Sequence, residues 1–355
     1  MVALADDPDR QAQYPVGWDP AEGNLLLLGI GGSGTTTTLQ AIALSLAAGS
    51  PPESLELYAI DYGTGDLAVL DALPHTGSVI AAEDRERQVR LIRHLRAELN
   101  RRRAGVIRRR IVVLIDNLSA LRSEFDDIEG LELLDVLTRL YADGTAAGIS
   151  FAVTADRFST IPPAWASVTT QRWLFRLPDP YDYVQAGLTR KDVPAKVPGR
   201  MVVLPGARQA QAGRPTPSAA SMVDMVARKY PDARRTAARI GVLPAEVSVD
   251  ALSSPDLTGE PWHLPLGIRE SDLSVATLAL YEGEHALVAG PARCGKSTAL
   301  LSLAAVLRQR VFLAGTGGRR SPLRDCPDLD EYAPPTALAA MLRETFGLTP
   351  LVPTA

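Results

Sequence analysis

The sequence predicts an α/β fold with a mainly parallel sheet, and three observations point to it. Short apolar runs alternate with longer segments of helical periodicity through the first 205 residues. These runs are apolar throughout, which is typical of parallel strands that are buried on both faces. The pattern of strand, glycine-rich loop and helix returns near residue 285, so two domains of this kind are expected in tandem.

The elements of the first domain are predicted in chain order. Apolar, β-branched runs indicate strands at residues 24–30, 55–61, 111–116 and 149–156. Apolar side chains that recur every three or four positions indicate helices at residues 35–48, 84–103 and 131–143. Because strands alternate with helices, the sheet is expected to be doubly wound.

The composition of the chain changes at residue 206. Residues 206–221 are rich in Gly, Pro, Ala and Ser, which favours an exposed connection, and Pro231 interrupts the helical pattern that follows. The second domain is expected to contain strands at residues 285–290 and 310–318 and a helix at residues 297–308. The predicted domains are residues 1–205, a linker with a helix at 206–261, and the start of a second domain at 262–355.

Composition excludes several classes of protein. The 355-residue chain has a formal net charge of −4, so no global basic charge favours nucleic acid. Two cysteines are too few for a disulfide-built secreted scaffold. The apolar runs fall far short of the roughly 20 residues of a membrane span, and no signal peptide is visible. The basic runs at residues 101–103 and 108–110 are interpreted as a solvated helix end and turn, with DNA phosphate contact as the alternative.

The second glycine-rich loop satisfies the pattern G-x-x-x-x-G-K-[ST] at every fixed position. Its backbone N–H groups are expected to surround the phosphates of ATP, with Lys296 opposing their charge and Ser297 binding Mg²⁺. The predicted nucleotide-binding residues are Gly290, Pro291, Ala292, Arg293, Cys294, Gly295, Lys296 and Ser297. Lys296 is also the candidate catalytic residue of this domain.

The first loop has the same glycines but carries Thr35 where the lysine belongs. It can still present N–H donors to a phosphate, with Thr36 as the Mg²⁺ ligand, yet it lacks the ammonium that would face the γ-phosphate. Nucleotide binding and a purely structural role both stay open for it. The residues in question are Gly29, Ile30, Gly31, Gly32, Ser33, Gly34, Thr35 and Thr36.

Asp116 ends an apolar strand, as the Walker B carboxylate that holds Mg²⁺ does. It is therefore the candidate catalytic and metal-binding residue of the first domain, and a simple strand-end cap is the alternative. The next residue is Asn117, whose amide can orient a water but cannot accept its proton. Thr35 and Asn117 together predict a degenerate first site.

The second domain is expected to be incomplete. Thr35 and Asp116 are 81 positions apart (116 − 35), and the same spacing from Lys296 points to position 377, whereas the sequence has 355 residues. The intact second loop therefore lacks a visible Walker B partner, and little ATP hydrolysis is expected from this chain by itself.

With these residues in hand, the chain resembles the FtsK/SpoIIIE superfamily of P-loop ATPases, and within it the tandem ATPase domains of type VII secretion proteins of the EccC kind. The resemblance covers nearly the whole chain. It rests on the order of several segments, among them LADDPDRQAQYPVGWDP, YAIDYGTGDLAVLDALPHTGSVI, IDNLSALRSEF, VTADRFSTIPPAW, FRLPDPYDYVQAGL, PGRMVV, LPLGIRESDL and RRSPLRD.

This resemblance implies a RecA-like core, a homo-oligomeric ring, and ATP-driven movement of a secreted protein or DNA. It also implies a cytoplasmic location at the inner face of the cell membrane, through upstream segments or partner subunits. The first domain is expected to be regulatory. By position Thr154 resembles a sensor residue, and Arg157, Arg172 and Arg176 are candidates for reaching a neighbouring nucleotide.

Two other functions stay open at this point. A DNA translocase shares the core, although the acidic net charge and the lack of a winged-helix signal disfavour it. A scaffold that binds peptide partners without catalysis is the other alternative. Two further residues receive plain interpretations: His75 as a turn or packing residue, and Cys294 as a thiol whose oxidation could block the second loop.

Overall fold

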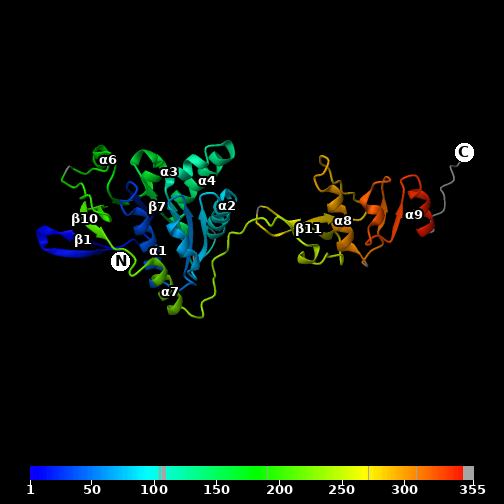
Figure 1. Cartoon of the computed structure of the whole chain (residues 1–355), viewed down its shortest axis with the longest axis horizontal. Helices are drawn as coiled ribbons and strands as arrows, with labels where there is room; N and C mark the ends of the chain where they lie inside the picture. The colour runs from blue at the N-terminus through cyan, green and yellow to red at the C-terminus, as the bar shows by residue number, and fades with distance from the viewer. Residues whose placement is uncertain (104, 106–108, 190, 271, 309, 347–355) are drawn as a thin grey trace. The chain divides into compact units, whose positions relative to one another are not determined.

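The structure is a computed structural model that describes residues 1–103, 105, 109–189, 191–270, 272–308 and 310–346. The contacts divide the chain into two units, Met1–Gly241 and Val242–Ala355 (Figure 1). Both contain helices and strands, but only the first holds a large sheet in its described residues.

The described part of the first unit is built on one ten-stranded sheet. Its central strands are parallel, in the order β8 (Gln171–Leu174), β3 (Leu25–Leu28), β7 (Ile149–Ala155), β6 (Arg110–Asp116), β4 (Leu55–Asp61) and β5 (Thr76–Ala81). Beyond β8 the sheet continues antiparallel through β9 (Arg200–Leu204), β10 (Arg208–Ala212), β1 (Ala3–Asp7) and β2 (Ala12–Val16). The predicted mainly parallel α/β sheet is confirmed.

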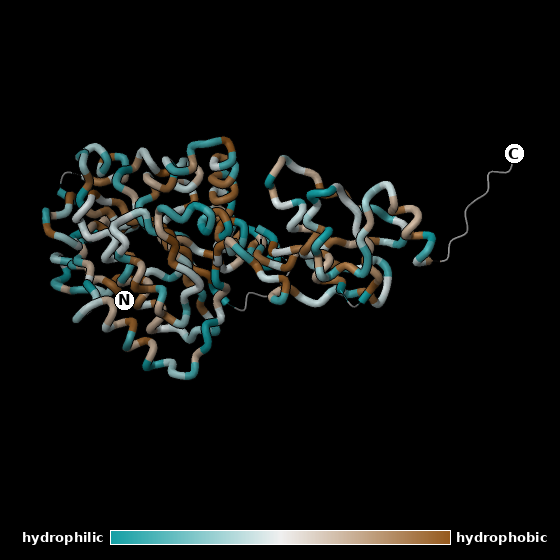
Figure 2. Tube along the Cα trace, turned by 45° about the vertical axis from the view of Figure 1, so that its right-hand side comes forward, coloured by the Kyte–Doolittle hydropathy of each residue, from teal (hydrophilic) through white to brown (hydrophobic). Residues whose placement is uncertain are grey.

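Helices cover both faces of the sheet, as the apolar runs predict. Figure 1 shows the strands between α1 (Thr35–Gly49) on one side and α2 (Arg85–Arg102) and α4 (Ile128–Asp143) on the other. β3 contributes side chains to both cores, since Leu26 and Leu28 pack with α2 and α4, and Leu25 and Leu27 pack with α1 and α7 (Ala219–Lys229). Figure 2 shows the hydrophobic residues inside this unit. The short helices are α3 (Leu118–Glu124), α5 (Pro163–Val168) and α6 (Pro180–Gln185).

The exposed connection predicted at residues 206–221 is confirmed only at 213–217 and is wrong at residues 208–212. Residues 208–212 form β10, which pairs with β9 and β1. Ala210 faces the core and is only 1% exposed, while its neighbours Gln209 and Gln211 alternate to the other face. Because Gln alternates with Ala at residues 209–212, no apolar run in the sequence indicated this strand. The first unit consequently runs to Gly241 rather than ending at the expected boundary after residue 205.

Residues 231–241 form a non-helical segment that is bound to the edge strand β5. The Ile240 N–H donates to Ser78 Oγ at 3.0 Å, and the Arg235 guanidinium donates to the Thr76 carbonyl at 2.7 Å. Ala237 and Ile240 are buried in the core of the unit. This segment covers the outer strand of the sheet, whose edge would otherwise expose unpaired backbone groups. His75 nearby is a buried packing residue, as expected, and its Nε2–H donates to the Ser50 carbonyl at 2.8 Å.

The second unit has two small sheets in its described residues. An antiparallel pair is formed by β11 (Trp262–Ile268) and β12 (Val275–Leu280), and a parallel pair by β13 (Ala314–Thr316) and β14 (Glu331–Ala333). Its helices are α8 (Lys296–Leu307) and α9 (Leu338–Phe346).

The strand predicted at residues 285–290 is absent, and the one predicted at 310–318 is reduced to β13. In the first unit the equivalent strand, β3, lies between β7 and β8. Residues 285–290 pair with no strand in the described residues, and Leu287 is 91% exposed.

Candidate phosphate-binding site

The first glycine-rich loop, residues 29–34, connects β3 to α1 in a fixed conformation. The Gly29 N–H donates to the Ala155 carbonyl of β7 at 2.9 Å, and the Ile30 N–H donates to the Arg176 carbonyl at 2.9 Å. Gly32 and Gly34 take left-handed φ values of 76° and 102°. α1 then begins at Thr35 without a side-chain cap, so the N–H groups of its first turn stay available to a ligand.

Glycine is required at Gly34 for two separate reasons. Its φ is left-handed, and a Cβ built there would lie 2.8 Å from the backbone nitrogen of Gly199. The Gly199 N–H in turn donates to the Ser33 carbonyl at 2.8 Å, so this backbone contact holds the loop against residues 198–199. Neither backbone can move without breaking the other's hydrogen bonds.

We expect Gly34→Ala to lower the free energy of unfolding by about 1–3 kcal/mol, because strain and the backbone collision act together. Chemical denaturation monitored by circular dichroism measures this loss. Gly31→Ala is the matched control, because a Cβ at Gly31 meets no atom within 4 Å. Equal losses in the two variants would contradict the argument.

The second loop repeats the left-handed conformation at two matching positions. With the 261-residue offset between the loops (290 − 29), Arg293 stands at the place of Gly32 and Gly295 at the place of Gly34, with φ values of 64° and 93°. α8 begins at Lys296, the equivalent of Thr35. The Lys296 ammonium folds back over the loop and donates to the Gly290 carbonyl at 2.8 Å and the Pro291 carbonyl at 2.5 Å.

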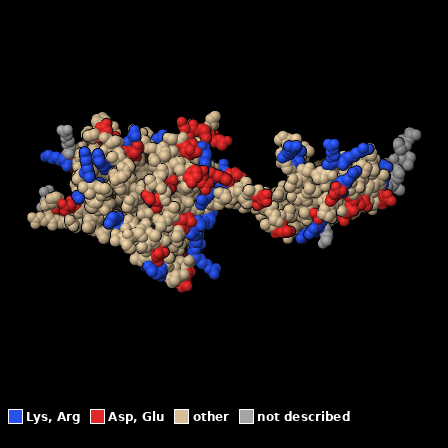
Figure 3. Space-filling view, viewed as in Figure 1, with Lys and Arg blue, Asp and Glu red and all other residues tan. Residues whose placement is uncertain are grey.

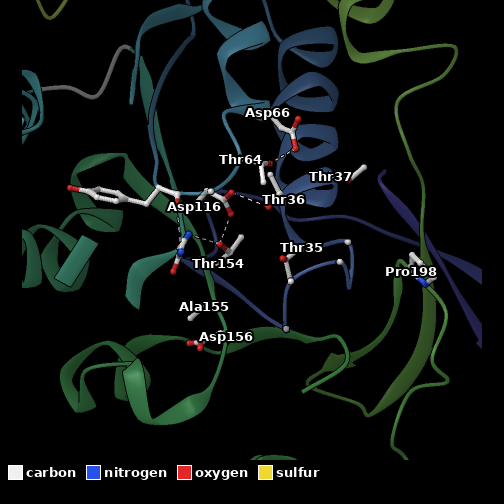
Figure 4. Close-up of a pocket in the computed structure, with 17 residues that line it drawn as sticks. Thr35, Thr36, Thr37, Thr64, Asp66, Asp116, Thr154, Ala155, Asp156 and Pro198 are labelled. Atoms are coloured by element: carbon white, nitrogen blue, oxygen red, sulfur yellow. Dashed lines mark hydrogen bonds between the residues drawn. The ribbon is translucent and has the colours of Figure 1, made fainter. Parts of the chain in front are cut away.

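Asp116 lies opposite the first loop, between two threonines (Figure 4). Thr36 Oγ1 donates to Asp116 Oδ2 at 2.9 Å, and Thr154 Oγ1 donates to Oδ1 at 2.5 Å. Burial raises the pKa of the Asp116 carboxyl, while the two hydroxyl donors oppose that rise. The structure thus brings together Thr36 and Asp116, the two oxygen ligands that the sequence proposes for Mg²⁺, with the expected sensor residue Thr154 beside them.

Asn117 uses its polar groups within the fold. Its Oδ1 accepts from the Ala120 N–H at 3.2 Å and caps α3, and its Nδ2 donates to the Tyr62 carbonyl at 3.3 Å. Its left-handed φ of 66° is one that asparagine tolerates well. The backbone N–H of Asn117 donates to Thr154 Oγ1 at 2.8 Å. Asn117 therefore positions Thr154, and it offers no proton acceptor comparable to a carboxylate.

A cavity of about 650 Å³ separates the loop from Asp116. The turn after β4 forms part of its wall, although no nucleotide-binding motif in the sequence marks this turn. A Cβ at Gly63 would lie 2.1 Å from Asp116 Oδ2, so only glycine allows the turn to approach the carboxylate. Residues of the wall that the motifs did not reveal are Tyr62, Gly63, Thr64, Asp66, Asp156 and Pro198.

The three candidate arginines differ in their surroundings. Arg157 pairs with Asp156 at 2.7 Å, and Arg172 donates to the Ala166 carbonyl at 2.6 Å, so both are engaged within the unit. Arg176 instead lines a smaller cavity beside the first loop.

In the second unit, Ser297 and Cys294 are exposed, and no described carboxylate faces them as Asp116 faces Thr36.

Comparison with known proteins identifies the family. Residues 9–214, more than half of the chain, match the FtsK/SpoIIIE family. The chain belongs to the FtsK/SpoIIIE family. The match spans the first loop, Asp116 and the antiparallel strands β9 and β10, which accounts for most of the first unit of this FtsK/SpoIIIE protein.

Relatives of this FtsK/SpoIIIE chain are secretion system proteins. The ESX-4 secretion system protein EccC4 of Mycobacterium tuberculosis is 27% identical over 325 residues, which cover 85% of this chain and 25% of the relative. The ESX-1 secretion system protein EccCb1 of Mycolicibacterium smegmatis is 26% identical over 352 residues, which cover 87% and 58%. The chain therefore spans between a quarter and somewhat more than half of the length of these relatives.

Solved structures with a similar fold include pairs of ATPase domains. EccC (ATPases 2 and 3) of Thermomonospora curvata, in complex with a signal sequence peptide, has a TM-score of 0.71 and 25% identity, covering 99% of this chain and 71% of that one. EssC (ATPases 2 and 3) of Geobacillus thermodenitrificans has a TM-score of 0.81 at 22% identity, covering 98% and 72%, and shows the fold alone. The prediction of tandem P-loop domains is confirmed. In the described residues, no helix combines the length and apolarity that crossing a membrane requires.

Proposed function

We propose that this chain is an ATP-binding part of an EccC-like secretion ATPase, with one loop of each unit holding ATP and Mg²⁺. The observation that supports this most is the shared loop conformation, with left-handed φ at the same two positions in both units. Such a loop points consecutive N–H groups inward and binds phosphate oxygens. It is retained in the second unit even though the strand before the loop is absent.

The residues of the two loops would hold the nucleotide in different ways. In the second unit, Lys296 would exchange its carbonyl partners for phosphate oxygens, and Ser297 would be the Mg²⁺ ligand. In the first unit, Thr36 and Asp116 would be the Mg²⁺ ligands, directly or through water. Bound ATP would supply a phosphoric anhydride whose hydrolysis drives motion. Thr154 would keep the Asp116 carboxylate oriented.

The first unit is proposed to bind nucleotide without rapid hydrolysis and to regulate the assembly. Thr35 provides no ammonium, and the amide of Asn117 is committed to Ala120 and Tyr62. A site that binds ATP but does not turn it over can stabilise an interface between subunits for long periods. This supports a regulatory role in a homo-oligomeric ring.

We expect Thr35→Lys to tighten ATP binding by the first unit about tenfold, because a charge-assisted hydrogen bond to phosphate is restored. Titration of a fluorescent ATP analogue into a Lys296→Ala background measures the first unit by itself. Thr170→Lys, at an exposed threonine that lines neither cavity beside the loop, is the matched charge control. An equal gain from both substitutions would reveal a general charge effect and contradict the specific one.

The transported polymer is proposed to be a secreted protein. The Thermomonospora curvata relative is in complex with a signal sequence peptide, and a similar peptide is the proposed partner here. Membrane-anchored segments or subunits of the same secretion system would place the chain at the inner face of the cell membrane.

The basic runs give little support to the alternative of a DNA translocase. Arg101 and Arg102 both pair with Glu98, and Arg103 pairs with Asp143. In the second run Arg108 lies outside the described residues, and Arg109 pairs with Glu56. On the face that Figure 3 shows, most of the surface is uncharged and both signs of charge occur on each unit. DNA that stimulates ATP hydrolysis and binds with steep salt dependence would favour the translocase instead.

A further inference from the structure

We infer that Arg176 and Lys196 supply, within the same unit, the positive charge that Thr35 leaves out of the first phosphate-binding loop. This inference rests on the proposed nucleotide binding and names two residues that no motif assigns to it. A cavity of about 120 Å³ lies against the loop and is lined by Ile30, Gly31, Gly32, Ser33, Arg176, Lys196, Val197 and Pro198. It shares Gly31, Gly32 and Pro198 with the larger cavity in front of Asp116.

Backbone hydrogen bonds hold the two segments that carry Arg176 and Lys196 beside the loop. Arg176 follows β8, and its carbonyl accepts from the Ile30 N–H at 2.9 Å. Lys196 precedes the turn at residues 197–199, where the Gly199 N–H donates to the Ser33 carbonyl at 2.8 Å. The two cations therefore reach the loop from two different segments, each of which is bonded to the loop itself.

Neither cation is used elsewhere in the described fold. Within residues that the structure describes, the Arg176 guanidinium and the Lys196 ammonium make no side-chain hydrogen bond and no ion pair, in contrast to Arg157 and Arg172. The hydroxyl of Ser33, which lines the same cavity, is buried and has no hydrogen-bond partner in that part of the chain. Two unpaired cations and a buried unpaired hydroxyl, all at one glycine-rich loop, are suited to a polyanion such as a nucleotide phosphate.

In the second unit, a lysine next to the loop provides the positive charge that we assign to Arg176 and Lys196 in the first unit. There the loop carries Lys296, whose ammonium reaches the carbonyls of the loop from the first turn of α8. In the first unit the Thr35 side chain is uncharged and too short to reach the carbonyls of the loop. Positive charge for a bound phosphate would therefore have to come from residues outside the loop. Arg176 was a candidate for reaching the nucleotide of a neighbouring subunit, and the shared cavity instead places it at the loop of its own unit.

The test is a titration of a fluorescent ATP analogue into the full chain carrying Lys296→Ala, which removes the second loop's lysine. We expect the added pair Arg176→Gln and Lys196→Gln to weaken binding by about 10- to 100-fold, as loss of charge-assisted hydrogen bonds to phosphate would. Arg139→Gln and Lys191→Gln are the matched controls, because both cations are exposed and neither lines a cavity beside the loop. These controls should leave the affinity unchanged.

A second readout separates charge supply from a structural role. Thr35→Lys should restore most of the affinity for the ATP analogue that the double variant has lost. The same substitution should raise this affinity less when Arg176 and Lys196 are present, because all three charges then bind the same phosphates. The affinity should also be independent of protein concentration, as binding within one subunit requires. Unchanged affinity in the double variant, or no rescue by Thr35→Lys, would overturn the inference while nucleotide binding by the first loop stands. Absence of binding in Lys296→Ala itself would overturn both.

Discussion

Lys296→Ala is expected to weaken ATP binding by the second unit at least about 100-fold. Among the described residues, the ammonium of Lys296 has only two carbonyls and the Cys294 sulfur of its own loop as partners, so it can turn to a stronger acceptor. Phosphate oxygens carry full negative charge, and a hydrogen bond to a charged group contributes about 1.5–3 kcal/mol. Alanine removes both the charge and the donors. Titration of a fluorescent ATP analogue in a Thr36→Ala, Asp116→Asn background, which disables the first site, measures the second unit.

The control for this prediction is Arg310→Ala, which removes an exposed cation from the same unit at a distance of 14 positions along the chain (310 − 296). It should bind the analogue as the parent does. Binding by Lys296→Ala at parental affinity would refute the assignment of the second loop as a triphosphate site. A loss that is equal in both variants would point to the net charge of the unit.

The parts of this protein that follow from local sequence were predicted well. The two loops depend on glycines, a lysine and hydroxyls at fixed spacing, and the backbone φ values at Gly34 and Gly295 follow from the same residues. The strands β4 and β6 are long apolar runs, and their bounds agree with the prediction to within one residue. In these cases the local pattern and the tertiary packing favour the same structure.

The parts that depend on distant neighbours were missed or predicted wrongly. Residues 285–290 resemble β3 in sequence, but a strand exists only when another strand pairs with it. β10 is the opposite case, because its alternating Ala and Gln residues look like a connection until β1 and β9 are beside it. Lys196 reaches the first loop because the Gly199 N–H bonds to the Ser33 carbonyl, and nothing near residue 196 in the sequence signals this contact.

Asp116→Asn is expected to have opposite effects on stability and on ligand binding. Burial raises the pKa of the Asp116 carboxyl, so ionising this carboxyl costs more free energy in the folded protein than in the unfolded chain. An asparagine can accept from one threonine and donate to the other, since each hydroxyl can serve in either role. We therefore expect the unliganded variant to be more stable by about 1 kcal/mol at pH 7, which for a unit of this size raises Tm by about 2–4 °C.

The pH dependence of this gain has a definite sign. Because the folded pKa of Asp116 lies above its unfolded value, wild-type stability falls as pH rises through the folded pKa, and the penalty is absent below the unfolded pKa. The advantage of Asp116→Asn should accordingly be present at neutral pH and vanish in acid. Thermal unfolding followed at several pH values measures it, with Asp126→Asn, an exposed carboxyl, as the control.

The same substitution should weaken the Mg²⁺-dependent part of ATP binding by the first unit about 100-fold, because a neutral amide is a much poorer partner for Mg²⁺ than a carboxylate. Titrations with and without Mg²⁺ in the Lys296→Ala background separate this part from the contribution of the loop N–H groups. If Asp116 only capped a strand end, its replacement would leave the Mg²⁺ dependence intact. A variant that gains stability and keeps the Mg²⁺ dependence of ATP binding would thus exclude Asp116 from metal binding. A variant that gains stability and loses the Mg²⁺ dependence is what we expect of a buried metal-binding carboxylate.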